Sequence, residues 1–395
     1  MRIVLFSVVC LVLSACGNTS QVALESLPNG PNVLPVTVGN CGPSGYLNEP
    51  CASVTICTPG TSACQTVDNL LVDTGSYGLR VFSSVLGIGL NHTVDGSGRT
   101  VAECTSYADG SSDWGPVAVA DVELGSERAD SVPIQLIDST FPGIAQANCD
   151  SNPDISPSQA GFNGILGVGL FTSDCGSNCA SDSSNGVYYV CSGANCTGST
   201  LAESNQVSNP VSFLPTDNNG VGLLLPAVYS NGAISAQGGL ILGIGTETNN
   251  VPSGTATMAA DTNGDFTTTF YGQTYNDSGN GTGSFIDSGS NEYYFPNPGA
   301  LAECSGQNSG LYCPSSLTSL NAVQISSSNN EQIQVLFYIN NADYLLNSNF
   351  GVFNDIGAPV SDGFAWGLPF FLGRTVWVGI SGKSSPVGEG PYWAY

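Results

Sequence analysis

Short apolar runs follow one another along the chain, and each of them ends at residues that favour turns. The runs are too short for helices, and no segment repeats apolar residues at the spacing of a long amphipathic helix. Gly, Asn, Asp, Ser and Pro separate the runs, as in proteins built from many short strands. We therefore predict an all-β protein with strands at 54–56, 70–72, 117–124, 134–137, 240–244, 266–270, 335–339 and 376–380.

The N-terminus has a different pattern, in which Arg2 precedes an apolar run at 3–13. This run is too short to span a bilayer as a helix. The sequence Leu-Ser-Ala-Cys that ends at Cys16 resembles the lipobox of bacterial lipoproteins. We expect residues 1–15 to be a lipoprotein signal peptide, Cys16 to carry lipid, and residues 16–35 to be a spacer; the alternative is an ordinary secretory signal. The first interpretation predicts an exported protein, lipid-anchored in the bacterial cell envelope on its periplasmic or outer-membrane face.

Composition narrows the range of functions. The 395 residues include 31 Asp and Glu but only 6 Lys and Arg, which gives a net charge of −25. Such a charge repels nucleic acids and anionic lipid surfaces, so we expect no nucleic-acid partner and membrane contact only through the anchor. The single histidine, His92, lies in a polar loop and is expected to be solvated, which argues against a Ser-His-Asp or Cys-His mechanism.

Twelve cysteines remain once Cys10 and Cys16 are set aside with the signal segment: Cys41, Cys51, Cys57, Cys64, Cys104, Cys149, Cys175, Cys179, Cys191, Cys196, Cys304 and Cys313. An even number in an exported chain indicates disulfides, up to six. Cys304–Cys313 is the easiest pair to propose, and Cys41–Cys51 and Cys57–Cys64 are plausible local pairs. The spacing of the four cysteines from 175 to 196 also allows a zinc site, but their Ser-, Asn- and Gly-rich surroundings favour two disulfides. We expect neither a metal nor a cofactor.

Two distant segments match each other. The first is Leu-Leu-Val-Asp-Thr-Gly-Ser at 70–76, and the second is Ser-Phe-Ile-Asp-Ser-Gly-Ser at 284–290. Each is an apolar strand that ends in Asp-[Thr/Ser]-Gly-Ser. Each is followed at a distance by an apolar-apolar-Gly strand, expected at 164–167 and at 370–373. Because both parts recur in the same order, we predict two duplicated lobes at 36–246 and 247–395.

This doubled motif resembles that of the pepsin-like aspartic peptidases. Further segments are similar to family features: a hairpin before the first motif at 60–67, a flap hairpin at 107–115, Phe-Asn-Gly-Ile-Leu-Gly ending at Gly167, and a strand leaving the first lobe at 239–243. The resemblance covers roughly residues 50–380 and implies a bilobal acid-protease fold, with two β-barrel lobes and a cleft between them. The chain is also similar to a bacterial family of uncharacterised lipoproteins with the same doubled pattern.

The resemblance implies an aspartic endopeptidase that acts on a peptide or protein substrate as a monomer. Asp73 and Asp287 would form the catalytic pair, since two carboxyls about 3 Å apart share one proton and can activate a water. The residues expected to support this pair are Thr74 and Ser288, which would bond across the lobes, Gly75 and Gly289, which allow close backbone approach, and Ser76 and Ser290, which would donate to the outer carboxylate oxygens. Tyr107 would close over the substrate as part of a mobile flap.

Three residues depart from the family pattern. Arg80 stands where the family usually has the Trp that supports the flap Tyr, Ala108 replaces a Gly, and Arg374 follows Gly373 where Asp is frequent. None of these changes removes a catalytic group, but they put the flap geometry in doubt. The alternative function is a catalytically silent, pepsin-like binding or inhibitor lipoprotein of the cell envelope.

Overall fold

Strands dominate the computed structural model, which describes residues 28–39, 41–42, 45–276, 283–328 and 331–395. Strands hold 43% of the residues and helices 9%, which confirms the all-β prediction. The predicted signal peptide, Cys16 and most of the 16–35 spacer lie outside the described residues. Among the helices of the described part, none is long and apolar enough to cross a membrane.

A closed barrel of six strands occupies the N-terminal half of the chain. Its strands follow in the order β2, β3, β8, β4, β7 and β6, and β6 returns to pair with β2. Their bounds are Pro50–Cys57, Cys64–Asp73, Gly164–Val168, Tyr77–Phe82, Glu127–Ile137 and Ser112–Leu124. On β8, Leu166 joins the main core and Ile165 joins a second apolar cluster. Both faces of β8 are therefore covered, which explains its continuous apolar sequence.

The same four-strand unit occurs twice in the chain. In the first half, β3 pairs parallel with β8, β8 antiparallel with β4, and β4 parallel with β7. In the second half, β16, β21, β17 and β20 pair in the same order and with the same directions. These strands span Ser284–Ile286, Phe364–Trp366, Tyr293–Phe295 and Gly357–Pro359. The internal repeat predicted from the sequence is therefore present in the strand topology.

The partner strand in the second unit differs from the one we expected. The sequence placed it at 370–373, but that segment begins with the last residue of the 3-10 turn η5 (Leu368–Phe370) and leads into β22 (Arg374–Gly379). The partner is β21, which ends one residue before Gly367, and Asp287 N donates to Trp366 O at 3.0 Å. Arg374 consequently lies outside the repeated unit, so its comparison with the family Asp was wrong.

Close backbone approach explains why Gly367, and not Gly373, is the counterpart of Gly167. A Cβ at Gly367 would lie 2.0 Å from Glu292 O, and a Cβ at Gly167 would lie 2.8 Å from Gly78 O. In each unit, the chain that follows the Asp-[Thr/Ser]-Gly-Ser loop passes directly over this glycine. The apolar-apolar-Gly pattern carries no information about that crossing, and the sequence offered two such patterns.

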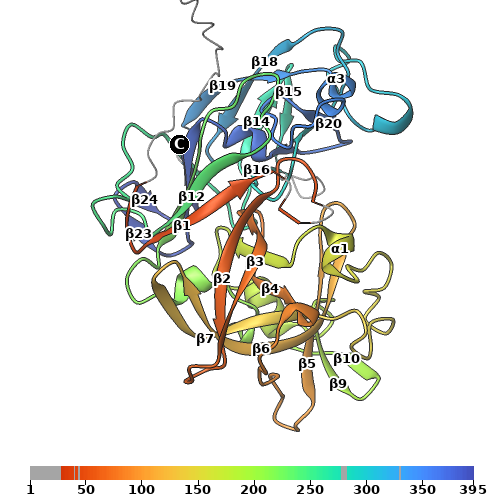
Figure 1. Cartoon of the computed structure of the whole chain (residues 1–395), viewed down its shortest axis with the longest axis vertical. Coiled ribbons are helices and arrows are strands. Elements are labelled where there is room, and N and C mark those ends of the chain that lie inside the picture. The colour runs from red at the N-terminus through yellow and green to blue at the C-terminus, as the bar shows by residue number, and fades with distance from the viewer. Residues whose placement is uncertain (1–27, 40, 43–44, 277–282, 329–330) are drawn as a thin grey trace, which may run out of the picture.

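One sheet joins strands from both ends of the chain. Figure 1 shows two of its strands, β1 and β12, between the barrel and the C-terminal sheets. It continues from the barrel strand β2 in the order β1, β12, β11, β22, β25 and β13. Besides β22, its strands span Val33–Val38, Ala236–Leu242, Gly220–Leu225, Tyr392–Ala394 and Thr257–Ala259. We predicted that β12 would run to residue 244; it ends earlier because Gly243 has a φ of 75°.

The remaining elements flank these sheets. Strands β15 (Gln273–Tyr275), β14 (Thr267–Phe270), β18 (Thr318–Ile325) and β19 (Gln332–Ile339) form a four-stranded sheet, and β5 (Thr100–Ser106), β9 (Tyr188–Ser192) and β10 (Asn195–Gly198) extend from β6. The pair β23 (Ser384–Ser385) and β24 (Gly388–Glu389) is short. The helices are α1 (Pro157–Ala160), α2 (Gly176–Ser181) and α3 (Ala342–Leu346), with 3-10 turns η1 (Ser83–Val85), η2 (Glu203–Asn205), η3 (Pro210–Phe213) and η4 (Gly306–Asn308).

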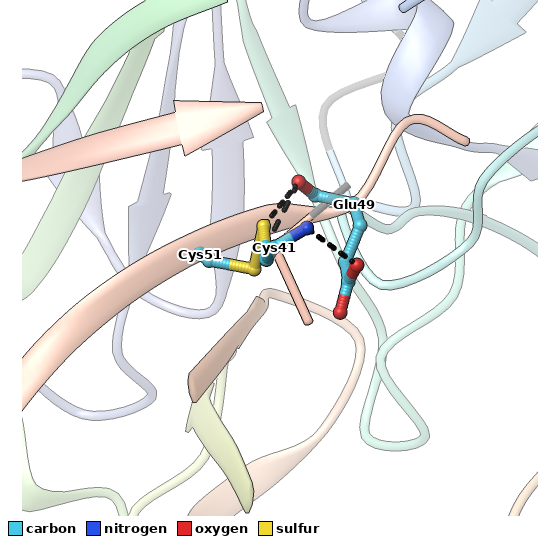
Figure 2. A group of neighbouring side chains, drawn as sticks. All are labelled: Cys41, Glu49 and Cys51. Carbon is cyan, nitrogen blue, oxygen red and sulfur yellow. Dashed lines mark hydrogen bonds between the residues drawn. A yellow bond between two sulfur atoms is a disulfide. The ribbon is translucent and has the colours of Figure 1, made fainter. Parts of the chain in front are cut away.

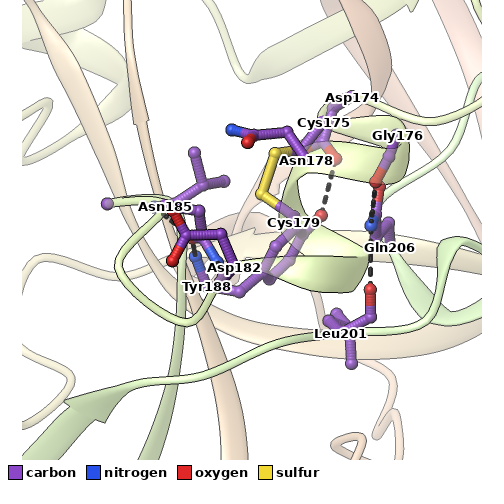
Figure 3. Close-up of a disulfide and its surroundings, with 12 residues drawn as sticks. Asp174, Cys175, Gly176, Asn178, Cys179, Asp182, Asn185, Tyr188, Leu201 and Gln206 are labelled. Atoms are coloured by element: carbon purple, nitrogen blue, oxygen red, sulfur yellow. Dashed lines mark hydrogen bonds between the residues drawn. A yellow bond between two sulfur atoms is a disulfide. The ribbon is translucent and has the colours of Figure 1, made fainter.

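Six disulfides pair the twelve cysteines predicted to form them. They are Cys41–Cys51, Cys57–Cys64, Cys104–Cys149, Cys175–Cys179, Cys191–Cys196 and Cys304–Cys313. Figure 2 shows the first, beside which the Glu49 carboxylate accepts from Cys41 N at 3.1 Å. Figure 3 shows Cys175–Cys179 at the start of α2. The cysteines of the 175–196 segment are thus joined as two disulfides, as we predicted in preference to a zinc site.

Candidate active site

The two Asp-[Thr/Ser]-Gly-Ser loops meet face to face. Asp73 ends β3, and Asp287 follows β16. A Cβ at Gly75 would lie 2.6 Å from Asp287 Cγ, and a Cβ at Gly289 would lie 2.7 Å from Asp73 Oδ1. Each glycine therefore lies against the carboxyl of the opposite loop, and a larger residue at either position would push the carboxyls apart. The two aspartates predicted as a pair are brought together.

Hydroxyl groups lock the two loops to each other. Ser288 N donates to Thr74 Oγ1 at 2.9 Å, and Thr74 N donates to Ser288 Oγ at 3.1 Å. Ser288 Oγ in turn donates to Val72 O at 2.7 Å. Thr74 and Ser288 are both buried. The predicted bonding between Thr74 and Ser288 is therefore made, by each hydroxyl to the backbone of the other loop.

Each carboxyl is also held by its own loop, but the two loops are not identical. Gly75 N donates to Asp73 Oδ1 and Gly289 N donates to Asp287 Oδ1, both at 2.8 Å. Ser290 Oγ donates to Asp287 Oδ2 at 2.6 Å, as we predicted. Ser76 Oγ is buried and has no hydrogen-bond partner among the described residues. The expected bond from Ser76 to Asp73 is not made, and nothing in the structure explains this difference.

The electrostatics of the pair follow from this proximity. Desolvation, the negative charge of Asp73 and the hydrogen bond between the two carboxyls raise the pKa of Asp287 well above its ordinary value. A raised pKa means that the pair retains a proton at a pH where an isolated carboxyl would have lost it. Because the two groups titrate together, this proton belongs to the pair. The arrangement can supply one carboxylate and one carboxylic acid at the same point.

A cavity of about 320 Å³ opens beside the two loops. Thr74 and Gly75 of the first loop line it, together with the aromatic rings of Tyr77, Phe285 and Trp393 and the carboxyl of Asp265. Burial and the charges of Asp73, Asp265 and Asp287 raise the pKa of Tyr77, which therefore remains a neutral hydrogen-bonding group. The cavity therefore combines aromatic residues with the polar side chains of Thr74, Asn263 and Asp265 beside the aspartate loops.

Tyr107 lies in the turn between β5 and β6, where we predicted the flap. Its backbone N donates to Ser111 O at 3.0 Å, which closes the turn. Its ring packs against the cluster that contains Leu71 and Ile165, next to the first loop. The phenol donates to Asp113 Oδ2 at 2.8 Å. The hairpin and the tyrosine are therefore placed as predicted, and the phenol has a carboxyl partner that we did not anticipate.

Arg80 forms a buried ion-pair network behind this hairpin. The guanidinium lies 2.7 Å from Glu103 Oε1 and 2.9 Å from Asp174 Oδ2, and it also donates to Tyr77 O at 2.8 Å. Arg80 is only 1% exposed. Its carboxyl partner Asp174 comes directly before Cys175 and also accepts from Tyr188 Oη at 2.7 Å (Figure 3). A charged residue inside the apolar run at 79–82 is the sequence signal that could have predicted buried acidic partners.

His92 is exposed, as we predicted for a polar loop residue. Its ring lies 6.3 Å from that of Phe141, and it belongs to neither aspartate loop.

The family model described as "Protein of unknown function (DUF3443)" matches residues 28–395, so the chain belongs to this family. No curated protein sequence matches the chain. The family description assigns neither a reaction nor a ligand, so the site geometry carries the functional argument.

Proposed function

We propose that the chain is an aspartic endopeptidase, in which Asp73 and Asp287 activate a water for peptide hydrolysis. We further propose that the two four-strand units are the centres of two pepsin-like lobes, 36–246 and 247–395, with the substrate cleft between them. One observation carries the proposal: two topologically equivalent units present their Asp loops to each other and interlock them through Thr74 and Ser288. Ordinary strand-end turns have no reason to meet in this way.

The chemistry needs one base and one acid at the same carbonyl group. The ionised carboxyl of the pair takes a proton from the bound water, whose oxygen attacks the carbonyl carbon, while the other carboxyl gives its proton to the carbonyl oxygen. Collapse of the tetrahedral intermediate then breaks the C–N bond, and the proton taken from water passes to the leaving nitrogen. A hydroxyl of the intermediate returns its proton to the second carboxyl as the new C=O bond forms. The raised pKa of Asp287 supports this division, because it keeps one proton at the pair. We expect Tyr107 to exclude water from the cleft.

Hydrolysis of an unfolded protein mixture tests the proposal. The chain from residue 17 onward would be compared with its Asp73→Asn and Asp287→Asn variants between about pH 3 and 7, the range around ordinary carboxyl pKa values. Asp150→Asn, the same change at an exposed carboxylate, is the matched control. We expect cleavage by the parent and by the control, inhibition by pepstatin, and no cleavage by either dyad variant. Cleavage that survives both dyad substitutions would refute the assignment.

The second candidate is a binding or inhibitor protein on the same scaffold. The missing bond from Ser76 to Asp73 favours it, because this bond would help to hold a catalytic carboxylate. Against it stands the complete interlock between the loops, which a silent site does not need. A folded sample with all its disulfides that cleaves nothing at any pH, yet retains an envelope protein on a column, would establish this second function instead.

We also propose that the protein is exported and lipid-anchored through Cys16. Six disulfides support an oxidising compartment, where such bonds persist. Mass spectrometry of the membrane-extracted protein would reveal a diacylglyceryl group at Cys16, which Cys16→Ser would abolish. An unmodified, freely secreted N-terminus would show that the leader is an ordinary secretory signal.

A further inference from the structure

A second pair of carboxyls lies behind the Tyr107 hairpin. Asp113, on β6, is fully buried, and Asp154, in the segment before α1, is 5% exposed. One oxygen of Asp113 accepts from the Tyr107 phenol at 2.8 Å. Its other oxygen, Oδ1, is buried and accepts no N–H or hydroxyl hydrogen bond among the described residues. The further hydrogen-bonding neighbour of this carboxyl is the side chain of Asp154. Two carboxyls can bond to each other only through a proton, so a bond between Asp113 and Asp154 needs one.

Three hydrogen bonds and one disulfide hold Asp154 against Asp113. Asp154 N donates to Ser112 O at 2.9 Å, and Ser112 N donates to Asn152 O at 3.1 Å, so this segment runs along the start of β6. Ser112 Oγ donates to Cys149 O at 3.0 Å. The Cys104–Cys149 disulfide ties the same segment to β5, the other strand of the hairpin. The second pair is therefore built into the base of the hairpin, and it is not a chance meeting of surface acids.

Among the described residues, the base that acts on this second pair is Arg80 on β4. Arg80 is already paired with Glu103 on β5 and with Asp174. Burial alone would raise the pKa of Glu103, but the Arg80 guanidinium holds this pKa below its ordinary value. Burial and the neighbouring Glu103 raise the pKa of Asp174.

The remaining charged group that acts on the second pair is Asp109 at the tip of the hairpin turn. Every additional charge that faces the pair is therefore either negative or already neutralised by a partner.

We propose that Asp113 and Asp154 are positioning residues, which hold the flap tyrosine Tyr107 in place through a shared proton and thereby set the upper pH limit of the active site. The effect on the pH limit of hydrolysis rests on the proposed peptidase function. The effect on the position of Tyr107 does not. It also explains how this chain supports its flap with Arg80 in the place of a tryptophan: the phenol bonds to Asp113 instead.

The direction of the effect follows from the charges. Burial and the Asp154 carboxyl raise the pKa of Asp113 to about 8, and burial together with Asp109 raises that of Asp154 to about 6. Below this range the pair is protonated and can bond. As the pH rises through about 8 the last proton leaves, and two adjacent negative charges remain in a buried site. Their repulsion favours a hairpin that is detached from its base.

Asp154→Asn is the sharpest test, because it keeps the shape of the side chain and supplies a permanent donor to Asp113. The full chain, purified in detergent and carrying Asp73→Asn to silence the dyad, would be treated with chymotrypsin between pH 6 and 9. The rate of the cut after Tyr107 would be divided by the rate after Tyr229, which is 54% exposed, to cancel the pH dependence of the protease. Asp150→Asn is the matched control, and Asp154→Glu is the conservative variant that restores a titrating group.

We expect this ratio to rise about tenfold or more in the parent and in the control, to stay nearly constant in Asp154→Asn, and to rise again in Asp154→Glu. Equal ratios in the parent and in Asp154→Asn at every pH would overturn the proposal. With the dyad intact, Asp154→Asn should also extend the alkaline limb of the hydrolysis profile by about one pH unit or more. A chain that hydrolyses nothing but shows the expected proteolysis pattern would refute the peptidase function and leave the positioning role standing.

Discussion

Removing the Ser288 hydroxyl tests whether the interlock between the two loops holds the site together. This oxygen is fully buried, accepts from Thr74 N at 3.1 Å and donates to Val72 O at 2.7 Å. Ser288→Ala removes the acceptor of Thr74 N and the hydroxyl donor to Val72 O, both in the buried contact between the loops. Losing a buried hydrogen-bond partner costs about 1–3 kcal/mol per group, so we expect a loss of roughly 2–6 kcal/mol. That is a large part of the 5–15 kcal/mol or so that is typical for a folded domain.

Urea unfolding of the oxidised protein, followed by near-UV circular dichroism, measures this loss. For a slope of about 3 kcal/mol per molar, the urea midpoint should fall by roughly 1–2 M. Two variants bracket the result. Ser288→Thr keeps the hydroxyl, and Thr already fills the equivalent position in the first loop, so most of the stability should remain. Ser97→Ala removes an exposed loop hydroxyl and should change stability by less than about 0.5 kcal/mol.

The reasoning would be wrong if Ser288→Ala unfolded within about 0.5 kcal/mol of Ser97→Ala. It would also be wrong if Ser288→Thr lost as much stability as the alanine variant, because the size of the residue and not the hydroxyl would then be decisive.

Three further predictions follow from the site and its surroundings. Gly289→Ala places a methyl group 2.7 Å from Asp73 Oδ1 and should lower peptide hydrolysis about 100-fold, measured as kcat/KM beside a Gly96→Ala control, whose added methyl group meets no neighbouring atom. Removing Cys104–Cys149, whose loop spans 45 residues, should cost about 4 kcal/mol in the same urea assay, and a loss below about 1 kcal/mol would contradict the chain-entropy argument. Burial raises the pKa of Glu292 to about 7, so its contribution to stability is present in acid and is lost as the pH rises from about 4.5 to 7. The unfolding free energy of Glu292→Gln should therefore decrease less over that pH range than that of the parent, by an amount on the order of 3 kcal/mol. An equal decrease in both proteins would contradict the raised pKa of Glu292.

Local pattern was enough to predict strands such as β19 and the first loop of the site. Strand β19 reads Gln-Ile-Gln-Val-Leu-Phe-Tyr-Ile, and its buried and exposed residues alternate along its C-terminal part as the pattern requires. The Asp-Thr-Gly-Ser loop at 73–76 follows a strand that becomes continuously buried from Leu70 onward. Such features depend only on neighbouring residues, so the sequence contains them in full.

Pairing over long distances was harder to predict. The partner of β16 is Phe-Ala-Trp before Gly367, while we chose the more regular Phe-Phe-Leu before Gly373. What distinguishes the two glycines is the backbone of residue 292, which crosses Gly367 and leaves no room for a side chain. That crossing depends on how the chain folds back after the second Asp loop. No short window of sequence contains this information.

Buried charge was the least predictable part of the site. Arg80 could be recognised as a departure from the family, but its partners Glu103 and Asp174 lie far along the chain, in Ser-, Gly- and Cys-rich segments that suggest exposed loops. The acids themselves show no pattern, because a carboxyl in a turn and a carboxyl under a hairpin look alike in sequence. Only the three-dimensional meeting of β4, β5 and the segment before α2 shows that these charges are buried and paired.

The buried carboxyls and the proposed chemistry favour the same side of the pH scale. Burial raises the pKa of Glu49 to about 7, that of Asp355 to about 7 and, with the Asp154 carboxyl, that of Asp113 to about 8. All three are essentially inaccessible to solvent. Each has a folded pKa above its unfolded value, so each stabilises the fold in acid and loses that contribution as the pH rises toward 7 or 8.

An aspartate pair that works by keeping one proton needs the same conditions. With only 6 Lys and Arg in the chain, protonating the carboxyls also leaves little positive self-repulsion to expand the folded state. The scarcity of basic residues, the burial of acidic ones and the close approach of Asp73 and Asp287 are therefore mutually consistent with the proposed hydrolysis in acid.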